Sequence, residues 1–175
     1  LGILWCDGAI YPCFCSRKTA ADQALASTDP DGQFHYGGTC RGIPRSVVAE
    51  RIARGDPHSW RIDMHACRDA AANIWGDAVI ARPHVGSWYH IAVVTDDALQ
   101  GVTHVVRGRD LEAATPLHKL LQRLLGLPTP RYTHHDLVRD KDEQKLSKSL
   151  KSDSLAALRE SGITASALKK RLGFV

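Results

Sequence analysis

The sequence predicts an α/β fold with a parallel sheet. Segments with the residue pattern of strands alternate with segments that have the pattern of helices, and this alternation is typical of that class. The first 45 residues differ, because they are rich in loops and hold four of the five cysteines. We therefore divide the chain into a small insertion at residues 1–45, a partial α/β domain at 46–150 and a helical segment at 151–175.

The composition is that of an ordinary soluble globular protein of 175 residues, with 43% apolar and 24% charged residues. No run of about 18 apolar residues is present, so we expect no membrane span. No basic stretch precedes an apolar one, so we expect no signal peptide and a cytoplasmic protein. The net charge of +4 suits a polyanionic partner such as RNA, although charge alone favours an ordinary, slightly basic surface.

The first third is expected to contain two helices separated by loops. Residues 11–18 are interpreted as a strand or turn that presents two thiols, and residues 19–27 as an alanine-rich helix. The Asp, Pro and Gly residues of segment 28–40 indicate a loop. A second helix is predicted at residues 45–54, because Pro44 suits the start of a helix.

The middle third is expected to be rich in strands. Residues 59–64 alternate between polar and apolar side chains, which is the period of a strand. A second strand is predicted at 73–82, and a buried one at 87–94, where apolar residues follow one another. Residues 102–107 have the pattern of a short apolar strand that ends at Arg107.

The last third is expected to be mostly helical. A helix is predicted at 111–126, because its apolar residues recur at the spacing of one buried face: Leu117, Leu120, Leu121, Leu124 and Leu125. Gly126 suits the end of that helix. Residues 134–152 are interpreted as a polar loop, and two short helices are predicted at 155–160 and 165–171.

A loop near the C-terminus, Lys-Leu-Ser-Lys-Ser at 145–149, combines two ammonium groups with two hydroxyls. Nucleotidyl transfer from ATP develops negative charge on the leaving pyrophosphate, and lysines on a mobile loop can stabilise that charge as it forms. A solvated basic loop has the same composition, so the five residues alone fit both interpretations equally well.

The surroundings of this loop resemble the second half of the catalytic domain of glutamyl-tRNA synthetases. They are still more similar to the short paralogues of those enzymes, the glutamyl-Q tRNA(Asp) synthetases. The loop follows a strand-like segment at 134–139, where class I synthetases carry their second signature, and the run from Tyr89 to Arg107 is also similar. Val93 favours the paralogue, because discriminating glutamyl-tRNA synthetases have Asn there.

The resemblance implies the C-terminal portion of a Rossmann-like catalytic domain, with a zinc-binding insertion and a terminal helical segment. It implies a ligase that activates glutamate with ATP and transfers it to the queuosine base of tRNA(Asp). By resemblance, Lys145, Ser147 and Lys148 bind ATP, with Lys148 as the catalytic residue that stabilises the pyrophosphate. Tyr89 and Arg107 would hold glutamate, whose carboxylates suit the planar fork of an arginine.

The cysteines are expected to bind a metal, because their odd number and the missing secretory signal make a disulfide framework unsuitable. Three of them are spaced like metal ligands: Cys13, Cys15 and Cys40. Zinc prefers four ligands, and from chemistry alone His35 is the best fourth, with Cys6 as a contender. The resemblance instead implies Tyr36, since the family binds zinc with a Cys-x-Cys pair and a Tyr-x3-Cys pair.

The first signature of class I synthetases, His-x-Gly-His, is absent from this sequence; segment 84–87, His-Val-Gly-Ser, differs in its last residue and in its position. We therefore expect an N-terminally truncated enzyme that acts as a monomer and cannot form glutamyl-adenylate alone. Two alternatives stay open. One is a fragment of an ordinary glutamyl-tRNA synthetase, and the other is a non-catalytic zinc-containing module that binds RNA.

Overall fold

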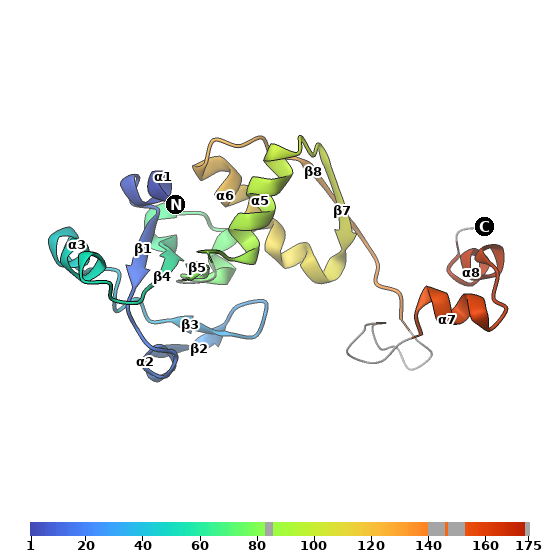
Figure 1. Ribbon diagram of the computed structural model, residues 1–175, viewed down its shortest axis with the longest axis horizontal. Helices are drawn as coiled ribbons and strands as arrows, with labels where there is room; N and C mark the ends of the chain where they lie inside the picture. Colours follow the sequence, from blue (N-terminus) through green and yellow to red (C-terminus); the bar gives the residue numbers. More distant parts are fainter. Residues whose placement is uncertain (83–85, 140–145, 147–152, 174–175) are drawn as a thin grey trace.

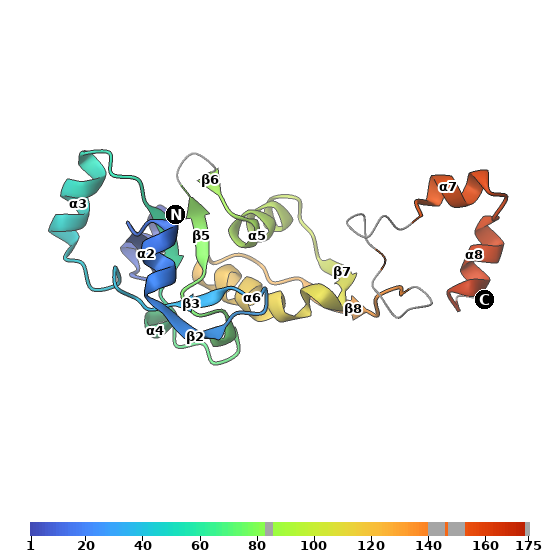
Figure 2. The same cartoon turned by 90° about the horizontal axis from the view of Figure 1, so that it is seen from below.

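The computed structural model describes residues 1–82, 86–139, 146 and 153–173 of the chain (Figure 1). Its elements alternate between helices and strands, as expected of an α/β protein. Figure 2 shows the strands β5 (Val79–Arg82) and β6 (Gly86–Ser87) between α3 (Arg45–Ala53) on one side and α5 (Tyr89–Leu99) and α6 (Thr115–Leu124) on the other. No helix within the described ranges is both long and apolar enough to cross a membrane.

The four-stranded sheet has the order β1-β4-β5-β6, with β1 (Ile10–Cys13), β4 (Ser59–Ile62), β5 (Val79–Arg82) and β6 (Gly86–Ser87). All three pairs in it are antiparallel, so the expectation of a parallel sheet is wrong here. The reason is plain for β5 and β6, because only three residues join them and a parallel pair needs a long crossover. β1 lies before position 45 and β4 lies after it, so this sheet crosses the boundary predicted from the sequence between the insertion and the α/β domain.

A parallel pair does form between β7 (His104–Gly108) and β8 (Arg131–His135). The 3-10 helix η2 (Arg109–Ala114) and α6 (Thr115–Leu124) make the crossover between these two strands. The strand predicted at 102–107 and the helical segment predicted at 111–126 are confirmed in outline. The register sets Arg107 beside His134 on the neighbouring strand.

Segment 87–94 is mostly helical, so the strand expected there is wrong. The helix α5 (Tyr89–Leu99) begins two residues into that segment, and its buried residues are His90, Ile91 and Val94. These three positions fall on one face of a helix. A continuous apolar run does not distinguish a buried strand from a buried helix, and here the packing of α5 against α6 and β5 decides.

The N-terminal region contains α1 (Gly2–Cys6), α2 (Arg17–Asp22), β2 (Ala24–Thr28), β3 (Phe34–Tyr36) and α3 (Arg45–Ala53). The helix predicted at 45–54 is confirmed. The helix predicted at 19–27 is correct only as far as Asp22, because Ala24–Thr28 pairs with β3 as an antiparallel hairpin. Pairing with a partner strand thus overrides the helix propensity of the alanines.

The remaining short elements bring one further correction. Between β4 and β5 lie α4 (Met64–Cys67) and the 3-10 helix η1 (Ala72–Trp75), so the strand predicted at 73–82 is wrong for its first half. The two predicted C-terminal helices are confirmed as α7 (Leu155–Glu160) and α8 (Ala165–Arg171). Each helix is capped at its N-terminus by a hydroxyl. The Ser154 hydroxyl accepts the backbone N–H of Ala157, and the Thr164 hydroxyl accepts that of Ala167.

The core lies between the four-stranded sheet and the helices α5 and α6. Its fully buried large side chains come from α1, the strands, α5 and α6: Leu4, Ile10, Ile62, Ile80, Val94, Leu117, Leu120 and Leu121. A second, smaller buried cluster contains Tyr11, Cys13, Tyr36 and Cys40. This smaller cluster contains the first of the two candidate sites described next.

Candidate functional site

Three thiols meet where β1 ends and the loop after β3 turns back. The Sγ atoms of Cys13, Cys15 and Cys40 all lie within 4.8 Å of one another, and those of Cys15 and Cys40 are 3.6 Å apart. Cys13 and Cys40 are buried, whereas Cys15 is partly exposed. Of the described residues, these three make the group of His, Cys, Asp or Glu side chains that could hold a metal ion.

The side chain of Tyr36 completes the cluster. Its Oη lies 3.2 Å from the Cys15 Sγ and accepts the backbone N–H of Cys40 at 3.1 Å. Burial, followed by hydrogen bonds with the thiols, raises the pKa of Tyr36 well above its usual range. Without a metal, the phenol therefore keeps its proton.

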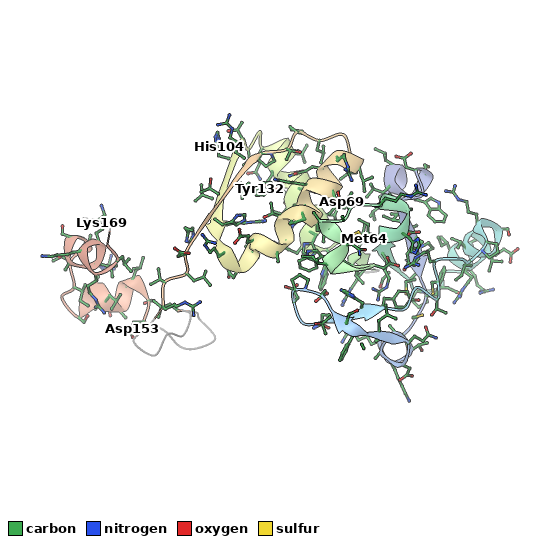
Figure 3. All side chains as sticks on the ribbon, turned by 180° about the vertical axis from the view of Figure 1, so that it is seen from behind. Met64, Asp69, His104, Tyr132, Asp153 and Lys169 are labelled. Carbon is green, nitrogen blue, oxygen red and sulfur yellow. The ribbon has the colours of Figure 1, made fainter. Side chains whose placement is uncertain are left out.

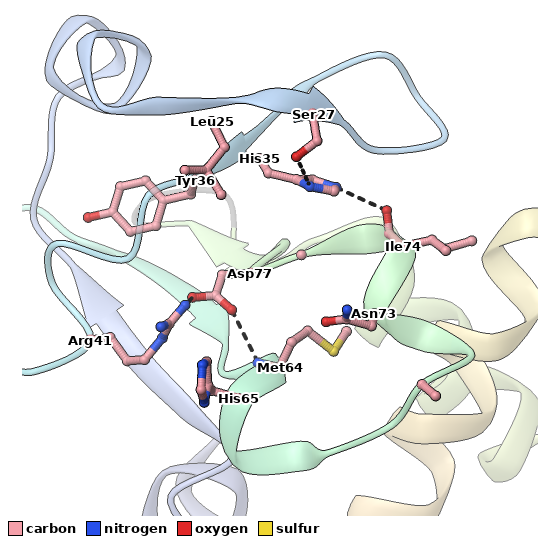
Figure 4. A pocket seen from close by; sticks show the side chains of 12 residues that line it. Leu25, Ser27, His35, Tyr36, Arg41, Met64, His65, Asn73, Ile74 and Asp77 are labelled. Carbon is pink, nitrogen blue, oxygen red and sulfur yellow. Dashed lines mark hydrogen bonds and ion pairs between the residues drawn. The ribbon is translucent and has the colours of Figure 1, made fainter.

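The histidine that chemistry alone favours lies elsewhere. The Nδ1 of His35 is 2.9 Å from the Oγ of Ser27, and its Nε2 is 3.0 Å from the carbonyl oxygen of Ile74. Figure 4 shows both contacts to the right of Tyr36, whose phenol oxygen points to the left, away from them. Cys6 is exposed and outside the thiol group.

The donor set fits a tetrahedral ion. With zinc–sulfur bonds of roughly 2.3 Å, two thiolates of a tetrahedron lie roughly 3.8 Å apart, close to the 3.6 Å between Cys15 and Cys40. The same arithmetic with an oxygen ligand gives roughly 3.5 Å, close to the 3.2 Å between Cys15 and Tyr36. The three thiols and the phenol therefore need only small movements to bind a metal.

The thiols differ in their pKa values. Burial raises the pKa of Cys15 to about 11, with further contributions from the neighbouring cysteines. Burial also disfavours the Cys13 thiolate, but hydrogen bonds from Tyr36, the Cys15 backbone and Arg61, with the charge of Arg61, lower its pKa overall. Cys13 therefore loses its proton more readily than Cys15.

A buried carboxylate joins this cluster to the sheet. Asp77 is 4% exposed, and it accepts hydrogen bonds from the Tyr11 hydroxyl, the Arg41 guanidinium and the Met64 backbone N–H. Figure 4 shows Arg41 and Met64 converging on it. Together they form one wall of a cavity of about 490 Å³, whose other lining residues include Leu25, His35, Tyr36, Asn73 and Ile74.

A second polar group surrounds Arg107 on β7. Its Nη2 donates to the Thr115 hydroxyl at 2.7 Å, its Nη1 to the Nδ1 of His118 at 3.1 Å, and its Nε lies 3.4 Å from the Nε2 of His134. All three partners are uncharged side chains or histidines. The guanidinium also lies 5.1 Å from the ring centroid of Tyr132, which Figure 3 labels on β8.

Tyr89 reaches the same histidine from α5. Its ring centroid lies 5.7 Å from that of His118, and the Nε2 of His118 is 3.1 Å from the Nδ1 of His90. Because Arg107 can only donate, the Nδ1 of His118 accepts, so its Nε2 carries the proton and donates to His90. The structure thus brings Tyr89 and Arg107, which are 18 positions apart in the sequence, to one buried side chain.

Both histidines are neutral at ordinary pH. Burial, and then the charges of Arg107 and His90, lower the pKa of His118 to about 3. Burial also lowers the pKa of His90. A cation therefore sits beside two uncharged imidazoles and is not repelled by them.

Tyr89, 46% exposed, also lines a smaller cavity of about 180 Å³. The other residues around this cavity are Pro30, Asp31, Trp75, His90, Asp110, Leu111, Ala113 and Ala114. Arg107 is not part of that lining. The two expected glutamate ligands therefore share His118 but not this cavity.

The predicted ATP residues Lys145, Ser147 and Lys148 lie outside the described residues. Within their loop, Leu146 is described, and its backbone N–H donates to the carbonyl oxygen of Val138 at 3.1 Å.

A family model described as tRNA synthetases class I (E and Q), catalytic domain, matches residues 4–173. The chain belongs to this synthetase family. Its ligase character and α/β fold, and the resemblance to glutamyl-Q tRNA(Asp) synthetases, are thereby confirmed.

This synthetase chain is 38% identical to the glutamyl-Q tRNA(Asp) synthetase of Rhodobacter capsulatus, over 97% of this chain and 69% of the relative. It is 41% identical to the protein of that name from Thiobacillus denitrificans, over 89% of this chain and 52% of the relative. It is 40% identical to the protein of that name from Burkholderia cenocepacia, over 87% of this chain and 55% of the relative. The chain thus spans between half and about two thirds of the length of these curated relatives.

Solved structures show the same fold at lower identity. A glutamate tRNA ligase from Elizabethkingia meningosepticum, in complex with its amino acid, superposes with a TM-score of 0.64 at 21% identity, over 85% of this chain and 33% of that one. A glutamate-tRNA synthetase from Elizabethkingia anophelis superposes with a TM-score of 0.63 at 18% identity, over 93% of this chain and 35% of that one. The sheet and helices of this synthetase chain are therefore those of its class.

Sequence reasoning missed several residues that organise the two sites of this synthetase chain: Arg61, Asp77, His90, Thr115 and His118. For His118 a signal exists in the sequence, because it stands directly after Leu117 and three residues before Leu121, among the apolar residues that predict the buried face of this helix. A polar residue on such a face needs a partner, and that partner is Arg107. The other residues have no comparable local signal.

We predict that His118 makes the synthetase chain less stable as the pH falls. Its folded pKa of about 3 lies below the roughly 6.5 of an unfolded histidine, so the unfolded state binds the proton first. The free energy of unfolding should therefore fall by about 2 kcal/mol from pH 7 to pH 5 through this residue. We expect urea unfolding of His118→Gln to lack this contribution to the decrease in unfolding free energy between pH 7 and pH 5. The control His104→Gln, at an exposed position, should show the same decrease as the wild type. The same pH dependence in both variants would contradict the assignment.

Proposed function

We propose that this chain takes part in the ATP-dependent activation of glutamate and in its transfer to the queuosine base of tRNA(Asp). The relatives that are 38–42% identical to it carry the name glutamyl-Q tRNA(Asp) synthetase. The observation that carries the proposal is the guanidinium of Arg107, which makes no ion pair with an acid among the described residues.

Arg107 is suited to a carboxylate ligand. Thr115 and His118 hold two of its nitrogens in place without neutralising its charge. A half-buried cation of this kind gains most from an anion that arrives with the substrate, and a carboxylate can meet the planar fork bidentately. We therefore assign glutamate to Arg107, with the hydroxyl of Tyr89 as a second contact.

Val93 supports the choice of acceptor. It lies one helical turn after Tyr89 on α5, and it packs partly buried against the main core. An Asn at this position, which the discriminating glutamyl-tRNA synthetases have, would place a polar amide on the same face of the helix as Tyr89. An apolar residue there favours the glutamyl-Q type.

The reaction that we assign begins at the glutamate α-carboxylate, which attacks the α-phosphorus of ATP. A phosphorus–oxygen bond forms to glutamate, and the bond to the leaving pyrophosphate breaks. Lys148 stabilises the charge on the pyrophosphate, while Lys145 and Ser147 bind the phosphates of ATP. In the second step the glutamyl carbonyl carbon forms a bond to the queuosine base of tRNA(Asp), its bond to the phosphate oxygen of the adenylate breaks, and AMP leaves.

We assign zinc to Cys13, Cys15, Tyr36 and Cys40. The ion would connect the end of β1, β3 and the loop after it, a region with a small core of its own, and would supply part of its folding free energy. We propose residues 1–45 as a zinc-binding insertion that also contributes β1 to the main sheet, 46–150 as the partial catalytic domain and 151–175 as a C-terminal helical segment.

We predict that Arg107→Ala raises the glutamate KM at least about tenfold. A hydrogen bond to a charged group contributes roughly 1.5–3 kcal/mol, and the variant loses it. ATP–pyrophosphate exchange with the full-length enzyme measures the effect. Arg109→Ala is the matched control, because the Arg109 side chain turns instead to Glu112 and Asp136. An unchanged glutamate KM in Arg107→Ala would remove this residue from the pocket.

We also predict that the purified protein contains about one zinc ion per chain. Removal by a strong chelator should increase amide exchange in residues 10–43, while α6 and β8 keep their protection. Hydrogen exchange with and without the chelator measures the difference. A protein that is fully folded and free of zinc would rule out the metal centre.

A further inference from the structure

We propose that Arg61 is the charge-compensating residue of the metal centre and positions Tyr36 and Cys13 for the ion. The inference rests on the proposed binding of zinc by this cluster. It adds a residue outside the four ligands that sets how tightly the metal is held.

The sheet places Arg61 beside the cluster. Arg61 lies on β4 directly opposite Tyr11 on β1, two residues before Cys13. Its Cζ is 4.1 Å from the ring centroid of Tyr36, so the guanidinium covers the ring of a proposed ligand. The positive charge of the same guanidinium also helps to lower the pKa of the Cys13 thiol. One side chain thus covers the ring of Tyr36 and acts on the charge of Cys13, a ligand of the other pair.

The far end of the side chain is fixed as well. The Nη1 of Arg61 donates to the backbone carbonyl oxygen of Asp77 at 2.8 Å. The Nε is buried and has no hydrogen-bond partner among the described residues. An unpaired buried donor destabilises a fold, so a donor of this kind is expected to serve a negative group nearby.

The metal centre is the negative group that Arg61 can serve. A zinc ion with three thiolates carries a net charge of −1, and a phenolate from Tyr36 makes it −2. Two of the thiols are buried, so this charge is costly without a cation beside it. Arginine suits the place, because it keeps its charge at any ordinary pH and stacks on an aromatic ring.

The neighbouring Arg41 does not compensate the charge of the metal centre. The guanidinium of Arg41 lies against the carboxylate of Asp77 and within 3.5 Å of Asp63, so acids neutralise its charge. Figure 4 shows Arg41 turned toward Asp77. Within the described ranges, no such ion pair joins Arg61 to an acid. Arg61 is therefore the cation whose charge is left for the cluster.

The experiment measures zinc affinity in the full-length protein at one fixed pH, by competition with a chromophoric chelator. We expect Arg61→Met to weaken zinc binding by about 10- to 100-fold, the usual effect of losing an outer partner of metal ligands. Arg61→Lys keeps the charge and should recover a large part of that loss. The control Arg82→Met removes an arginine of β5 that covers the ring of Trp88 at 4.3 Å, and should stay within about twofold of the wild type.

Cobalt(II) substitution shows in each variant whether the thiols still bind the ion, because sulfur-to-cobalt absorption bands need that contact. Equal zinc affinity in the wild type and Arg61→Met overturns the inference. A loss in Arg61→Met that Arg61→Lys does not relieve overturns it too, because packing and not charge would then explain the effect. If Arg61→Met does not fold, Arg61→Gln takes its place with the same expected loss. If the wild type binds no zinc, the proposed metal centre itself is wrong. Tight zinc binding in every variant instead keeps the metal centre and overturns only the role of Arg61.

Discussion

The buried carboxylate of Asp77 is the constraint on which the arrangement of this chain depends. A carboxylate inside a protein is stable only when it is paired and hydrogen-bonded, and this one draws in Tyr11, Arg41 and the start of α4. Tyr11 belongs to the strand that ends in Cys13, and Arg41 follows Cys40 directly. The charge requirement of one side chain therefore sets where two of the thiols lie relative to the sheet.

The second site follows the opposite electrostatic principle. Around Arg107 the partners are a hydroxyl and histidines, and burial keeps His118 and His90 uncharged. The guanidinium is held in position while its charge stays available for a ligand. One arginine of the chain, Arg41, is thus neutralised by an acid and serves the fold, and another, Arg107, keeps its charge and is assigned to the substrate.

Local signals predicted the thiol cluster well and the sheet poorly. The spacing of Cys13, Cys15 and Cys40 is a property of short segments, and three sulfurs that can share one ion need only a turn between them. The helix at 89–99 is decided by its packing on α6 and β5, which an apolar run alone does not reveal. The strand at 24–28 is decided by its hairpin with β3, which overrides the helix propensity of its alanines. Asp77 acts through Tyr11, 66 positions away, which no local pattern reveals. The apolar residues around His118 indicate that this side chain needs a partner, but they do not identify Arg107, 11 positions away, as that partner.

The most direct test of the account is the identity of the acceptor. Full-length enzyme with ATP and labelled glutamate should be offered tRNA(Asp) with queuosine, tRNA(Asp) without it, and tRNA(Glu). The account predicts that the label becomes attached to the queuosine-containing tRNA(Asp) alone. Label on tRNA(Glu), or equal labelling of tRNA(Asp) with and without queuosine, would contradict it.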